Sequence, residues 1–173
     1  MIALLVRIGG LPKLFEIATE ADRPEFRALC LDLILDIARA VDMRVKTACL
    51  DPPVLLQSLV YTVCGDDASC AETVQCSMII TALMEVDSHR IIDNVFAEDG
   101  VMKSIIMRWR ACTGPARVWI GRVLASILLE EKGRVLLLKS LKGEDDAEVA
   151  AFLRLHINHQ FAPENEKGQH NGL

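Results

Sequence analysis

Residues 24–41, PEFRALCLDLILDIARAV, decide the fold that we predict for this chain. Pro24 suits the first turn of a helix, where a missing N–H does no harm. The apolar side chains that follow are spaced 3-1-3-1-3-1-3, which is the stripe of an amphipathic helix. They are Phe26, Leu29, Cys30, Leu33, Ile34, Ile37, Ala38 and Val41. We therefore expect a helix that runs from Pro24 to about Val41 and buries this stripe.

The same pattern returns 90 residues later without a gap. Arg27 aligns with Arg117, Leu33 with Val123 and Ile37 with Ile127. Three pairs that each open a short apolar run are 46 and 44 residues apart: Arg44-Val45, Arg90-Ile91 and Arg134-Val135. A period in the forties of helical units is typical of an α-solenoid, in which each unit buries its apolar face against its neighbours.

The period divides the chain into units of about 9–51, 52–99 and 100–143, followed by a last helix over 145–158. Within them we predict helices over 11–20 and 53–64, and a capping box formed by Ser69 and Glu72 that begins a helix through Glu85. Residues 1–160 then form one all-α domain. Residues 161–173 are polar and without periodicity, so we expect a disordered tail.

Composition narrows the class of protein. Hydrophobic residues make up 51% of the chain and aromatic residues 5%, so the core must be aliphatic. The net charge of −5 argues against nucleic-acid binding, which needs a basic field. Apolar runs are too short to span a bilayer, and the N-terminus lacks the basic region of a signal peptide. We expect no membrane contact and a cytoplasmic location.

The six cysteines form no CxxC pair. The interpretation that we favour is buried free thiols in a reducing compartment, and the alternative is a redox role for Cys64, Cys70 and Cys76. His156 and His159 are spaced to share a helix face, but no third ligand lies nearby. No pattern of a catalytic nucleophile or phosphate-binding loop is present. We therefore expect no metal, no cofactor and no enzymatic activity.

Residues 9–15, GGLPKLF, resemble the Gly-Gly-apolar-Pro-x-Leu start of the second helix of an armadillo repeat, and residues 98–103, EDGVMK, are a poorer copy of it. The middle unit has Pro52-Pro53 in place of the glycines. Over about residues 3–158 the chain thus resembles the armadillo (ARM/HEAT-like) repeat family. The resemblance implies a right-handed α-solenoid of about three repeats plus a C-terminal helix.

The resemblance to the armadillo repeat family also implies that the long third helix of each unit lines a concave groove that holds ligands. The groove positions would be Arg27, Asp32, Asp36, Arg39, Gln75, Thr81, Glu85, Arg117, Arg122 and Ser126. Such a groove is acidic at one end, near Asp32 and Asp36, and basic at the other, near Arg117 and Arg122. The alternative is an ordinary solvated helix face. Trp119 falls on the apolar stripe, and we expect it in the core.

Arg108-Trp109-Arg110, at the end of a predicted helix, is the single patch that we favour for a partner, because Trp and Arg are enriched at interface hot spots. In the alternative, Trp109 closes the gap between units. The function predicted from these features is a non-catalytic protein–protein interaction scaffold that binds a peptide or protein partner along its concave surface.

The alternative function is a structural segment of a longer solenoid in a cytoskeletal or ciliary assembly. Residues 2–8 read as the end of a preceding unit, so self-association or further repeats would use this apolar N-terminal end. If residues 1–8 instead form a capping helix, the chain would be a free-standing binder.

Overall fold

The computed structural model describes residues 10–20, 23–40, 42–51, 53–141 and 151. The chain divides into two compact units, Met1–Ser140 and Leu141–Leu173, and the helices below belong to the first. This unit is all-helical over its described residues, as predicted. Its elements are α2 (Gly10–Glu20), α3 (Pro24–Ala38), α4 (Met43–Ala48), α5 (Pro53–Cys64), α6 (Cys70–Ile91), the π-helical turn η1 (Ile92–Phe96), α7 (Val101–Ala111), α8 (Gly114–Leu129) and α9 (Glu131–Ser140).

Local sequence chemistry sets where the helices begin. Pro24 lies in the first turn of α3 and Pro115 in the first turn of α8. The Glu72 amide donates to Ser69 Oγ at 3.2 Å, and the Ser69 amide donates to Glu72 Oε2 at 3.0 Å. These two bonds satisfy backbone N–H groups that a helix start leaves unpaired. The predicted capping box is therefore confirmed.

The long helix α6 contains a break at Asp87, where φ is −156° and ψ is 80°. The Asp87 carboxylate accepts a hydrogen bond from the Arg90 amide at 3.0 Å, so Asp87 acts as the N-cap of a new helical turn. Asp42 caps α4 in the same way through the Arg44 amide at 2.9 Å. The helix predicted through Glu85 thus ends just before the break, and the pair Arg90-Ile91 lies after it.

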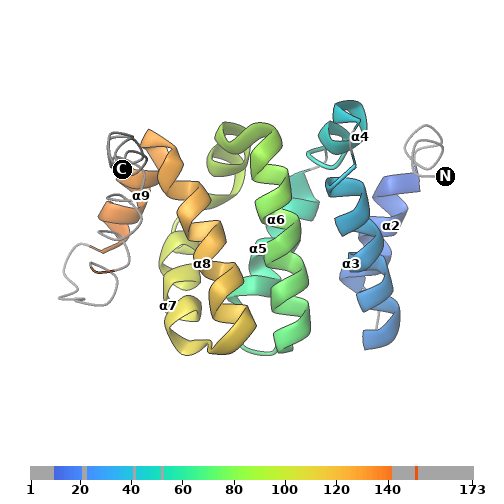
Figure 1. Ribbon diagram of the computed structural model, residues 1–173, viewed down its shortest axis with the longest axis horizontal. Helices are drawn as coiled ribbons and strands as arrows, with labels where there is room; N and C mark the ends of the chain where they lie inside the picture. The colour runs from blue at the N-terminus through green and yellow to red at the C-terminus, as the bar shows by residue number, and fades with distance from the viewer. Residues whose placement is uncertain (1–9, 21–22, 41, 52, 142–150, 152–173) are drawn as a thin grey trace, which may run out of the picture. The chain divides into compact units, whose positions relative to one another are not determined.

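The long helices α3, α6 and α8 lie side by side, with α6 between the other two (Figure 1). The shorter helices α2, α5 and α7 pack against them as a second layer. Three side-chain hydrogen bonds join residues that are 35 to 43 positions apart in the sequence. Arg27 and Thr62 are separated by 35 residues, Asp32 and Gln75 by 43, and Ser88 and Glu130 by 42.

The core between the layers is aliphatic, but the predicted stripe of α3 is only partly right. Phe26 and Leu29 are 57% and 65% exposed, whereas Leu31 and Leu35 are buried. The buried arc of α3 is set by its neighbours α2 and α6, and it turns away from the first two positions of the stripe. In α8 the stripe is buried except for Trp119, which is partly exposed. The prediction that Trp119 lies in the core was therefore wrong.

One helix end differs from the prediction: α3 ends at Ala38 rather than near Val41. The predicted last helix over 145–158, the tail over 161–173 and His156 and His159 lie outside the described residues. The limits of the predicted domain over 1–160 thus remain a prediction. In the described ranges, no helix has the length and apolar character needed to cross a bilayer.

Candidate functional site

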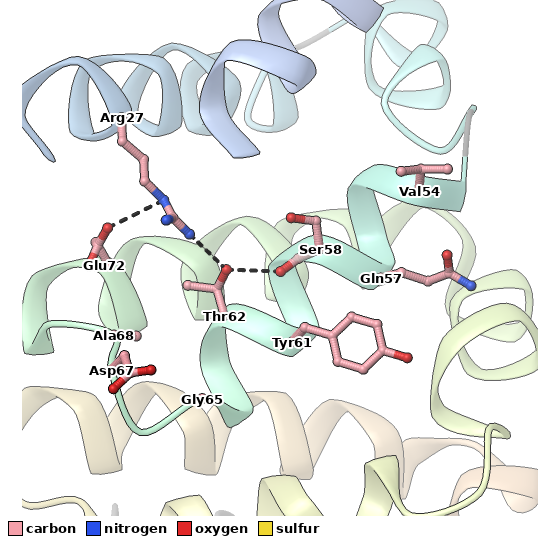
Figure 2. Close-up of a pocket in the computed structure, with 10 residues that line it drawn as sticks. All are labelled: Arg27, Val54, Gln57, Ser58, Tyr61, Thr62, Gly65, Asp67, Ala68 and Glu72. Atoms are coloured by element: carbon pink, nitrogen blue, oxygen red, sulfur yellow. Dashed lines mark hydrogen bonds and ion pairs between the residues drawn. The ribbon is translucent and has the colours of Figure 1, made fainter. Parts of the chain in front are cut away.

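The surface of α5 carries a hollow of about 530 Å³ (Figure 2). One face of α5 forms its floor, with Val54, Gln57, Ser58, Tyr61 and Thr62 at the spacing of helical turns, and Gly65 continues the floor just after the helix. Arg27 of α3, Asp67 and Ala68 of the α5–α6 loop and Glu72 of α6 complete it. Since Val54 and Tyr61 are both well exposed, the hollow offers an apolar wall beside charged groups.

A polar chain closes the side of the hollow where α3, α5 and α6 meet (Figure 2). Arg27 Nη2 donates to Thr62 Oγ1 at 3.0 Å, and the Thr62 hydroxyl donates to the Ser58 carbonyl at 2.9 Å. Arg27 Nε forms an ion pair with Glu72 Oε1 at 3.3 Å. These contacts join three helices, so Arg27 positions the helices instead of standing exposed on a groove face as the sequence suggested.

On the opposite side of the hollow, two lining residues contact Glu98, which lies between η1 and α7. Gln57 Nε2 and the Tyr61 hydroxyl both donate to the Glu98 carboxylate, at 2.8 Å and 3.1 Å. The hydrogen bond to Glu98, together with its negative charge, raises the pKa of the Tyr61 phenol. The tyrosine therefore stays neutral at physiological pH, with its ring open to solvent.

The Arg108-Trp109-Arg110 segment holds the α5–α6 loop. The Arg108 side chain is 14% exposed, and it contacts Asp66 Oδ1 and the Ala68 carbonyl, each at 3.3 Å. Trp109 is 6% exposed, with the Arg117 guanidinium 4.6 Å from its ring centroid. This placement favours the alternative in which Trp109 closes the gap between units. Arg110 lies partly exposed on the same helix, with Nη1 3.5 Å from Met107 Sδ.

The remaining predicted partner-binding residues lie on α3 and α8. Asp32 and Asp36 are exposed on α3, and Asp32 accepts a hydrogen bond from Gln75 of α6 at 2.6 Å. Arg122 is exposed on α8 and stacks on Trp119, with 4.3 Å between its guanidinium carbon and the ring centroid. The structure thus keeps the acidic residues and the arginine on separate long helices, with α6 between them.

Burial explains the chemistry of most of the cysteines. Desolvation raises the pKa of Cys49 and Cys76 to about 12 and that of Cys64 to about 11. Such thiols are poor nucleophiles, because the thiolate is the reactive form. Cys70, in contrast, is exposed. In the part of the chain that the structure describes, no three His, Cys, Asp or Glu residues are grouped as a metal site would require.

Comparisons of the chain with protein-family models, with curated proteins and with solved structures each gave no match. The sequence analysis had also missed the hollow on α5. Its α5 residues lie on a helix face that carries both apolar and polar side chains, and the hollow forms only where Arg27 of α3 and residues 67–72 lie against that face. The usable signal in the sequence was the spacing of Val54 and Tyr61, which lie two helical turns apart on one face of the predicted helix over 53–64.

Proposed function

We propose that this chain is part of an armadillo- or HEAT-like α-solenoid, and that it acts as a non-catalytic scaffold for a protein or peptide partner. The observation that carries the proposal is the register of the polar contacts between helices. Contacts such as Arg27–Thr62, Asp32–Gln75 and Ser88–Glu130 span 35 to 43 residues. Repeat arrays in which each unit touches only its neighbours produce this pattern, and they display extended surfaces for binding.

The binding surface that we propose follows α3, α6 and α8. Asp32, Asp36 and Glu85 are exposed on the first two of these helices, and Arg122 is exposed on the third. A partner segment with basic residues near α3 and acidic residues near α8 would match both ends, and such complementarity fixes orientation and register. The buried free thiols Cys30, Cys49 and Cys76 support a reducing compartment such as the cytoplasm.

Affinity capture with reversed charges tests this proposal. The double variant Asp32→Arg, Asp36→Arg and the single variant Arg122→Glu should each lose partners that the parent retains. Lys13→Glu is the control, because Lys13 is an exposed residue of α2, in the other layer. Circular dichroism must show parental helicity for all three. If the groove variants and the parent retain the same partners, α3 and α8 do not form the binding surface.

A second candidate function, a segment of a longer array, is favoured by the exposed apolar residues of α3. The positions 90 residues beyond Phe26 and Leu33 are Ala116 and Val123, and both are buried in α8. Phe26 thus occupies a position on α3 whose counterpart in α8 is covered, whereas the counterpart of Leu29 is Trp119, which is partly exposed. We expect the double variant Phe26→Ser, Leu29→Ser to remain folded and to abolish any self-association. Size-exclusion chromatography with light scattering would measure this, and a parent that is already monomeric at high concentration would count against the array.

A further inference from the structure

The hollow on α5 has a counterpart on α7. A second hollow, of about 470 Å³, is lined on α7 and its N-cap by Gly100, Lys103, Ser104, Met107, Arg108 and Ala111. Each of these residues lies 46 residues after a residue that lines the first hollow, either one of its five residues on α5 or Gly65, which follows α5. The repeat therefore reproduces the same concave feature, position by position, on two successive helices of one layer.

Residue size explains why both helices are hollowed on this face. Gly65 and Ala111 occupy the same position at one end, and Ser58 and Ser104 occupy the same position in the middle. These small side chains leave space between the larger side chains on either side, and that space is the hollow. Tyr61 and Met107 occupy a third shared position, and both are well exposed, at 59% and 49%. Each hollow thus offers a broad or adaptable apolar surface on which a ligand's side chain can lie.

The two hollows differ in charge. Asp67 and Glu72 line the first together with one guanidinium, that of Arg27, which is itself paired with Glu72. Glu98 adds a further carboxylate beside Tyr61. The second hollow contains two cationic side chains, Lys103 and Arg108, and one carboxylate, that of Asp66. The first hollow is therefore net acidic and the second net basic.

We propose that the α5 and α7 hollows together bind an extended peptide that carries a Lys or Arg and, about three residues away, an Asp or Glu. The basic side chain lies over the Tyr61 ring, where cation–π attraction and nearby carboxylates favour it. The acidic side chain enters the hollow beside Lys103. Packed helices lie about 8–10 Å apart, and an extended chain rises about 3.3 Å per residue, so about three residues join the two hollows.

This inference rests on the proposed scaffold function, but it places the ligand on the layer of α5 and α7 instead of on α3, α6 and α8. The occupant follows from charge complementarity: a peptide with two basic or two acidic residues would meet repulsion in one of the hollows. Because the two hollows are unlike, the order of the charges along the peptide also matters.

Nuclear magnetic resonance of the ¹⁵N-labelled full chain tests the inference. The probes are capped synthetic peptides, Gly-Lys-Gly-Ser-Glu-Gly and the reversed order Gly-Glu-Gly-Ser-Lys-Gly, with the Lys/Lys and Glu/Glu versions as controls. One of the two mixed-charge orders should shift amide signals in both α5 and α7 and reach saturation at a Kd on the order of 1 mM. The like-charged peptides should not saturate.

Variants assign the effect to the hollows. Tyr61→Ala and Asp67→Asn should each weaken binding about five-fold, which is the loss of one cation–π or charge contact. The exchange of charges in Asp67→Lys with Lys103→Glu should make the protein prefer the opposite peptide order, an outcome that unfolding cannot produce. Val118→Ala, at an exposed apolar site on α8, is the matched control and should leave binding unchanged.

Three results would overturn the inference: no saturable shift with either mixed-charge order, equal shifts with the like-charged controls, or shifts confined to α3, α6 and α8. These failures are distinct from failure of the scaffold proposal. If the double variant Asp32→Arg, Asp36→Arg abolishes partner capture while the peptides shift no signals in α5 and α7, only the proposed peptide site is refuted. If the peptides bind and the double variant captures the same partners as the parent, the peptide site is supported and the proposed α3–α6–α8 binding surface is refuted.

Discussion

Gly133 provides a sharp test of how the last described helix packs. A Cβ atom added at this position would lie 2.1 Å from the carbonyl oxygen of Ile127 and 2.9 Å from its carbonyl carbon. Both are backbone atoms at the end of α8, so no change of rotamer relieves the contact. The start of α9 would have to move by more than 1 Å to restore an ordinary separation of about 3.5 Å.

The magnitude follows from two opposing effects. Overpacking of this kind costs up to about 3 kcal/mol, and more when backbone must shift. Replacement of a helical glycine by alanine stabilises the helix by about 1 kcal/mol, because alanine has the higher helix propensity. We therefore expect Gly133→Ala to lower the free energy of unfolding by about 2 kcal/mol, although the same change in an unobstructed helix would be stabilising.

Urea denaturation followed by circular dichroism measures this loss, which should lower the midpoint by roughly 1 M for a chain of this size. Gly100→Ala is the control. Gly100 has φ of 86° and an open space where its Cβ would lie, so the substitution should cost only about 1 kcal/mol of backbone strain. A Gly133→Ala variant as stable as the parent would refute the close approach of α9 to α8.

Three further predictions concern single side chains. Thr73 is fully buried, and its hydroxyl has no hydrogen-bond partner among the described residues, so Thr73→Val should raise stability by about 1 kcal/mol in thermal denaturation; a lower melting temperature would show that the hydroxyl is satisfied. Tyr61 belongs to a chain with a single tyrosine, so absorbance of the phenolate reports its pKa alone, and Glu98→Gln should lower that pKa toward the ordinary value. Because the pKa of Tyr61 is raised in the fold, its contribution to stability is present below about pH 10 and is lost as the pH rises through the folded-state pKa; a titration that Glu98→Gln leaves unchanged would contradict the hydrogen bond. At pH 8 a thiol reagent should label the exposed Cys70 first and reach Cys49 and Cys76 only on unfolding, because burial raises the pKa of those two to about 12; prompt labelling of Cys49 would disprove its burial.

The features that the sequence predicted well are those that depend on neighbours along the chain. Helix α5 begins at Pro53 and ends at Cys64 as expected, because a proline and a turn rich in Gly and Asp mark its limits. The capping box of Ser69 and Glu72 is equally local. Such signals act within a single helical turn, so they do not require the fold to be known.

The features that the sequence predicted poorly depend on contacts between helices. A stripe such as that of α3 says that one side of a helix is apolar, but the helices packed around it decide which part is covered. Phe26 and Trp119 were misplaced for this reason. The hollow on α5 was missed because residues from α3, α5, the α5–α6 loop and α6 must converge to form it.

Pairwise disulfide trapping tests the linear order of the units most directly. In a background without the native cysteines, Asp32→Cys with Gln75→Cys should cross-link readily, since these side chains are in hydrogen-bond contact at 2.6 Å. Asp32→Cys with Arg122→Cys should not cross-link, because α6 lies between α3 and α8. Efficient trapping of the second pair would mean that the first and third units touch, and a stacked array would be excluded.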